Sequence, residues 1–102
     1  MLYHLSFRVE YDAEMGQPGL FAIWAEEAAV ALGAKSAGVV VDLWKVVGER
    51  RVFVVVNVES PDALDQILFD LPIMKKMGHL VQVEVKALRR YEDFAADVKA
   101  RL

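Results

Sequence analysis

Residues 39–59 read VVVDLWKVVGERRVFVVVNVE, and this stretch decides the class of fold. It contains two runs rich in β-branched residues, 39–47 and 51–59, which are typical of β-strands. Only residues 48–50, Gly-Glu-Arg, lie between the two runs, and so short a glycine-containing loop predicts a β-hairpin. In the second run every other residue is valine, so one face of that strand is entirely apolar.

The segments around the hairpin are assigned by the period of their apolar residues. Segments 2–10 and 81–87 alternate between apolar and polar side chains, as strands do. Segments 20–37, 61–71 and 91–102 repeat apolar residues at the spacing of a helix.

Capping residues and proline set the limits of these elements. Ser60 followed by Pro61 predicts the start of the second helix, and Pro72 is expected to stop it. Segment 12–19 is predicted to be a loop, and segment 73–80 is predicted to be a mobile connector.

The order βαββαβ, followed by a short C-terminal helix, predicts an α+β fold of the ferredoxin-like type, with one domain over residues 1–102. Two helices can cover only one face of its four-stranded antiparallel sheet. The open face is too apolar for water and too polar for a core. We therefore expect a second subunit's sheet or a small molecule to cover it, as in dimeric α+β barrels. The open face would carry His4, Ser6, Arg8, Phe53, Val55, Asn57, Gln82, Glu84 and Lys86.

Composition limits the classes of partner that the protein is expected to bind. Of the 102 residues 56% are hydrophobic, a surplus that favours a homo-oligomer, and the C-terminal stripe is expected to dock on its own sheet edge or on a neighbouring subunit. The net charge of −3 and the lack of basic runs argue against a nucleic-acid partner. No segment reads as a signal peptide or as the roughly 20 apolar residues that cross a membrane, so a cytoplasmic protein is expected.

Glu27 is the most informative candidate for chemistry. It falls in the middle of the apolar stripe of the first helix, beside Trp24, whereas Glu26 lies near the polar border. A carboxylate in such surroundings loses hydration, its pKa rises, and it becomes suited to taking up and returning a proton. Alternatively, Glu27 turns out to solvent or pairs with Arg8 or Lys45.

Four more side chains could contact a small-molecule ligand. His4 could orient or protonate a ligand oxygen, Asn57 could donate to a carbonyl, and Arg8 could hold a carboxylate. Trp44 could form a pocket wall. The alternatives are an interface histidine, an arginine paired with a nearby acid, and tryptophan packing. With no cysteine and one further histidine in a loop, no metal-ligand cluster is visible.

Several stretches, taken in order, resemble muconolactone delta-isomerases. The chain shares four patterns with that family. They are the start Met-Leu-aromatic-His, a Leu-Trp-Lys/Arg-x-x-Gly hairpin, a Val-x-Ser element before a helix closing in Leu-Pro, and a late Glu-Val-x-x-Leu-x-Arg segment. Here these are residues 1–4, 43–48, 58–60, 71–72 and 84–90.

The resemblance implies a ferredoxin-like subunit in an oligomer. It also implies an enzyme that works without a cofactor in aromatic-compound breakdown, moving a proton within an unsaturated lactone. The acidic residue of the family's first helix aligns with Glu27. The chain departs from the family at Ala28, Asp42 and Asp65, where the family has Lys, His and His.

The expected reaction is therefore a 1,3-proton shift in a small unsaturated lactone or enone. Glu27 would move the proton, His4 and Asn57 would polarise the carbonyl, and Arg8 would hold a carboxylate. Trp44 and the 74–77 segment would wall the pocket. Two rivals use the same fold: a non-catalytic ligand-binding or partner subunit, and a cofactor-independent oxygenase or cyclase. A closed pocket containing Glu27 would favour the isomerase.

Overall fold

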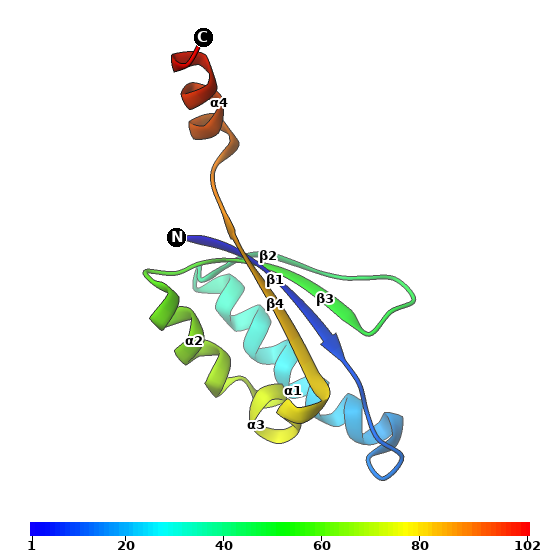
Figure 1. Ribbon diagram of the computed structural model, residues 1–102. Helices are drawn as coiled ribbons and strands as arrows, with labels where there is room; N and C mark the ends of the chain where they lie inside the picture. Colours follow the sequence, from blue (N-terminus) through cyan, green and yellow to red (C-terminus); the bar gives the residue numbers. More distant parts are fainter.

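The computed structural model describes all 102 residues as one antiparallel sheet, with every helix except the C-terminal one on a single face (Figure 1). The strand order is β2-β3-β1-β4, which confirms the predicted ferredoxin-like α+β fold. The elements are β1 (Leu2–Val9), α1 (Gly16–Ser36), β2 (Val40–Lys45), β3 (Arg51–Asn57), α2 (Pro61–Asp70), α3 (Pro72–Met77), a 3-10 turn (Gly78–Leu80), β4 (Val81–Leu88) and α4 (Tyr91–Ala100).

The main core lies between the sheet and the helices. Alternate residues of β1 point toward the helices, and Leu5 and Phe7 are almost fully buried there. Valines of β3 continue this layer, and Leu64 of α2 packs against it. A second core cluster joins α1, α3 and the end of β1 through Val9, Leu20, Ile73 and Met77.

Helix α2 begins where its capping residue and proline predict. Ser60 caps α2, because its side-chain oxygen accepts a hydrogen bond of 3.1 Å from the backbone N–H of Ala63. Pro61 is the first helical residue, where no N–H is needed. The predicted hairpin is also present, with Gly48 at a φ of 81° in its loop.

Two predicted boundaries are wrong. Helix α1 begins at Gly16, inside the segment predicted to be a loop, because Asp12 accepts a hydrogen bond from the Met15 N–H and Pro18 falls in the first turn, where proline is tolerated. The predicted mobile connector is instead α3 and a 3-10 turn, anchored by the buried Ile73 and Met77. The proline that ends α2 also begins α3.

Helix α4 stands apart from the rest of the molecule. It projects beyond the end of β4 (Figure 1), none of its residues is buried, and the chain measures 59 × 26 × 22 Å. Its stripe of Tyr91, Phe94 and Val98 is exposed, so docking on its own sheet edge is not what the structure shows. Burial of this stripe by a neighbouring subunit remains a prediction. No helix combines the length and apolar character that a membrane span requires.

Candidate active site

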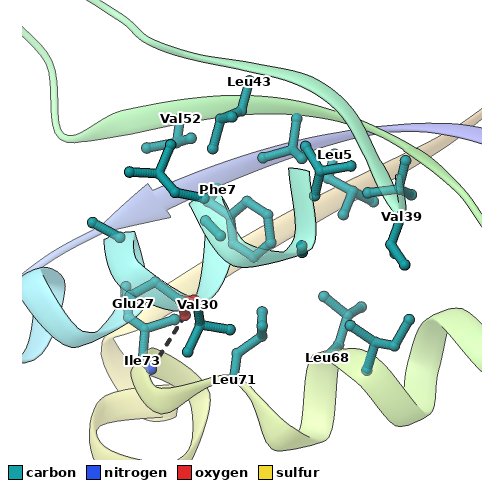
Figure 2. Close-up of a pocket in the computed structure, with 18 of the residues that line it drawn as sticks. Leu5, Phe7, Glu27, Val30, Val39, Leu43, Val52, Leu68, Leu71 and Ile73 are labelled. Atoms are coloured by element: carbon teal, nitrogen blue, oxygen red, sulfur yellow. Dashed lines mark hydrogen bonds between the residues drawn. The ribbon is translucent and has the colours of Figure 1, made fainter. Parts of the chain in front are cut away.

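An apolar cavity of about 340 Å³ lies between the sheet, α1 and α2 (Figure 2). This volume is at the lower end of the range for small-molecule sites, about 300–1,000 Å³. Leu5, Phe7 and Val52 form its sheet wall, and Val30 and Leu68 come from the two helices. Val30 of α1 and Trp44 of β2, both in the lining, are 45% and 52% exposed, so the cavity is open to solvent.

Glu27 supplies the single carboxylate of this cavity. Its side chain is half-buried, and its Oε1 accepts a 3.3 Å hydrogen bond from the backbone N–H of Ile73 at the start of α3 (Figure 2). Burial raises the pKa of Glu27 above its ordinary value of 4.5, and the hydrogen bond from Ile73 offsets part of that rise. A carboxyl group whose pKa is raised in this way is better suited to accepting and releasing a proton than a fully hydrated one.

The neighbouring acid behaves differently. Glu26 is exposed on α1 and forms an ion pair with Lys76 of α3. The predicted contrast between Glu26 and Glu27 is therefore confirmed, and the suggested pairing of Glu27 with Arg8 or Lys45 is wrong. Lys45 instead donates a 2.8 Å hydrogen bond to the carbonyl oxygen of Val46.

The opposite face of the sheet carries a second, polar hollow. Its wall includes His4, Ser6, Arg51, Phe53, Glu84 and Lys86. The rings of His4 and Phe53 lie 5.2 Å apart, and Arg51 donates a 2.8 Å hydrogen bond to the Ser6 hydroxyl. This is the predicted mixture of polar and aromatic side chains on the open face.

The five predicted site residues do not meet in one pocket. Glu27 and Trp44 line the apolar cavity, whereas His4 lies on the other face of the sheet. Arg8 is exposed and paired with a glutamate two residues along, and the Asn57 Oδ1 accepts a 3.1 Å hydrogen bond from the N-terminal ammonium. The expectation that all five surround one ligand is wrong for a single chain, since a strand sends consecutive side chains to opposite faces.

Lys45 is the lining residue that the sequence interpretation left without a role in ligand binding. Glu27 and Lys45 are the only charged or polar residues that line the apolar cavity. The signal was available in the sequence, because Lys45 follows Leu43 by two residues on β2 and so shares its face of the strand.

Comparison with known proteins agrees with this geometry. The model of the muconolactone delta-isomerase family matches residues 1–93. The chain belongs to this family. It is 31% identical to muconolactone delta-isomerase 2 of Acinetobacter lwoffii over 91 residues, which cover 89% of this chain and 91% of the relative. Membership of the muconolactone delta-isomerase family confirms the resemblance and supports an isomerase.

Comparison with solved structures supports the fold. A crystal structure of muconolactone isomerase superimposes with a TM-score of 0.74 at 27% identity, covering 88% of this chain and 90% of that one. A 5-chloro-2-hydroxyhydroquinone dehydrochlorinase of Burkholderia phenoliruptrix superimposes with a TM-score of 0.60, over 88% and 95% of the two chains. At 17% identity the dehydrochlorinase shows a shared fold only. The family match ends at residue 93, so most of α4 lies beyond it.

Proposed function

We propose that the protein is a cofactor-free isomerase that moves a proton between two carbons of a small unsaturated lactone, with Glu27 as the base. The observation that supports this most is the position of Glu27, a carboxylate with a raised pKa in a cavity whose other walls are almost wholly apolar. Family membership supports the reaction class.

The same carboxyl group would both remove the proton and return it. The Glu27 carboxylate takes a proton from the carbon next to the lactone carbonyl, which leaves a dienolate and a neutral Glu27 carboxyl. The same carboxyl then returns the proton to the γ-carbon of the conjugated system, so the double bond moves and Glu27 regains its charge. The apolar walls around Glu27 limit competing exchange with water.

The roles first given to His4, Asn57 and Arg8 do not form part of this proposal for a single chain. His4 lies across the sheet from Glu27, and the side chains of Asn57 and Arg8 are engaged with the N-terminus and Glu10. Trp44 keeps its proposed place as part of the cavity wall.

The test is deuterium uptake. A panel of unsaturated lactones is incubated with the protein in heavy water, and exchange and double-bond movement are followed by NMR. We expect wild type and Glu26→Gln to catalyse both, and Glu27→Gln to catalyse neither. An active Glu27→Gln variant would refute the choice of base. If wild type acts on none of the panel, the ligand-binding subunit becomes the better reading.

We also infer that the protein works as a homo-oligomer. The open face leaves Val55 only half-buried, and the stripe on α4 leaves Tyr91 and Phe94 exposed. A second copy would remove both surfaces from water. Sedimentation at micromolar concentration tests this inference, and a uniform monomer would contradict it.

A further inference from the structure

We propose that Lys76 is a positioning residue of the proposed isomerase. Its ion pair with Glu26 holds α3 against α1, so that the backbone N–H of Ile73 stays within hydrogen-bonding reach of Glu27. The inference rests on the proposed function for its effect on turnover only, because the contact between Ile73 and Glu27 can be followed in the protein without substrate.

Two consecutive acids of α1 bind α3 at two points. Glu27 accepts its hydrogen bond from the Ile73 N–H, and the Glu26 carboxylate pairs with the Lys76 ammonium group. Ile73 and Lys76 are three residues apart, a spacing that makes them neighbours on the surface of a helix. One contact lies at the cavity and the other is exposed, yet both join the same two helices.

The hydrogen bond to Glu27 tolerates little movement of α3. The distance of 3.3 Å between the Ile73 nitrogen and Glu27 Oε1 is already longer than the usual range of about 2.7–3.2 Å. A further small displacement of α3 away from α1 would therefore break the bond. Glu27 would then lose the donor that lowers its pKa, while burial would continue to raise that pKa.

Helix α3 depends on contacts with the rest of the chain for its position. It has six residues, fewer than the roughly 12–15 that an isolated helix needs. Ile73 and Met77 are buried in the second core cluster and fix the depth of α3. Apolar contacts have no preferred direction, so they restrain the rotation of α3 about its own axis only weakly. The ion pair of Lys76 lies outside the core and restrains that rotation.

The other charged side chains in this region have different partners. Helix α1 packs against α3 and β2, and besides Glu27 these three elements carry Glu26, Lys35, Asp42, Lys45, Lys75 and Lys76. Lys35 pairs with Asp42, and Lys75 pairs with Asp70 of α2. Lys45 donates to a backbone carbonyl oxygen of its own hairpin. Lys76 is thus the cation that joins α3 to α1.

Lys76 acts on Glu27 through the position of α3 rather than through its charge. Burial raises the pKa of Glu27 and the Ile73 hydrogen bond lowers it, with no contribution from a charged neighbour. Loss of the ion pair should therefore change the ionisation of Glu27 only by changing the contact with Ile73.

The test follows the Ile73 amide proton by NMR while the pH is varied, in protein without substrate. A hydrogen bond to an ionised carboxylate is shorter and stronger than one to a neutral carboxyl group, so this proton should shift as Glu27 ionises. The amplitude of the shift reports the contact, and its midpoint reports the pKa of Glu27.

Lys76→Met keeps the length of the side chain and removes its charge. We expect a smaller amplitude and a midpoint at higher pH, because Glu27 loses part of the donor that favours its ionised form. Lys76→Arg should restore both. Lys75→Met removes a cation of the same helix that pairs with α2, and it should titrate as wild type.

Glu26→Gln separates positioning from electrostatics. Removing a negative charge beside Glu27 can only lower the pKa of Glu27, whereas loosening α3 raises it. We expect the midpoint to lie above that of wild type. The double variant of Glu26→Gln and Lys76→Met should titrate like either single variant, because both changes remove the same contact.

Turnover supplies a second measurement. At a pH below the midpoint, deuterium uptake should slow by about two- to fivefold in Lys76→Met, and the wild-type rate should be approached at higher pH. The upper value corresponds to about 1 kcal/mol, the most that an exposed ion pair usually contributes.

The inference is overturned if the Ile73 amide of wild type does not titrate, if Lys76→Met titrates as wild type, or if Glu26→Gln lowers the midpoint. A lower melting temperature with an unchanged titration would likewise refute it, since Lys76 would then only stabilise the fold. Failure of the isomerase gives a different result, in which the titrations change as expected but no lactone takes up deuterium. Deuterium uptake together with an unchanged titration in Lys76→Met refutes this inference and leaves the isomerase intact.

Discussion

The two faces of the sheet are built from the same strands but offer different chemistry. On β1, Leu5 and Phe7 point into the apolar cavity, while His4 and Ser6 point to the open face. On the cavity side a single carboxylate has lost part of its hydration, whereas on the open side polar groups satisfy one another, as Arg51 does with Ser6. Proton transfer from carbon is favoured where the base is desolvated, so we propose that the chemistry takes place on the helix side and that subunits associate through the open side.

The largest expected effect separates the two faces by activity. Glu27→Gln should reduce the rate of proton transfer by about 10²–10⁴-fold, the usual contribution of a general base. His4→Gln, on the open face, should change the rate less than about threefold, since His4 does not line the cavity. Steady-state kinetics on the best lactone measures both. A greater loss in His4→Gln would reverse the assignment of the faces.

The next effect concerns association through the open face. Val55→Lys places a charge in the middle of that face, and burying it against a second subunit costs several kcal/mol, on the order of the penalty for an uncompensated ion. We expect a shift toward monomer in sedimentation velocity. Val47→Lys, on the exposed hairpin loop, is the matched control and should leave the mass unchanged. Equal behaviour of the two variants would place the interface elsewhere.

A moderate effect is expected from removing α4. Deletion of residues 91–102 removes the stripe of Tyr91, Phe94 and Val98, whose burial by a partner would stabilise the assembly. The melting temperature should fall, by roughly 4–8 °C for each kcal/mol lost in a chain of this size. If melting and mass both stay as in the full chain, α4 has no docking role.

The smallest expected effect is the pH dependence of stability. The folded state holds the Glu27 proton more tightly than the unfolded chain does, because its pKa is raised above 4.5. Its contribution to stability is therefore complete below that value and is lost as pH rises through the folded pKa.

Glu27→Gln should accordingly be more stable than wild type near neutral pH, with the advantage disappearing on acidification. The difference should stay below about 1 kcal/mol, since water screens a half-exposed carboxyl group. Urea denaturation near neutral pH and at acidic pH measures this difference in the free energy of unfolding. An advantage that grows toward acid would mean that the Glu27 carboxylate is stabilised, rather than penalised, in the fold.

Much of this comparison could be predicted from the sequence. Alternation in the four strands gave the two faces, and helical spacing placed Glu27 inward and Glu26 outward. The same alternation already separates His4 from Leu5, so the expectation of a shared site for His4 and Glu27 combined residues from two faces. Its correction needed only the rule that helices cover one face.

Other features could not be predicted, for physical reasons. Pro72 is compatible both with the end of one helix and with the start of another, and only the burial of Ile73 and Met77 decides for α3. Apolar spacing predicts a stripe on α4 but not which surface covers it, and no residue of α4 is buried within the chain.

The hydrogen bond from the Ile73 N–H to Glu27 has a consequence for how this site can vary among relatives. A main-chain donor is present whichever side chain occupies position 73, with proline as the exception. Substitutions there can alter packing yet keep the donor for the carboxylate. The orientation of Glu27 is thus encoded by the path of the backbone into α3, so a comparison of residue identities at position 73 would not register it.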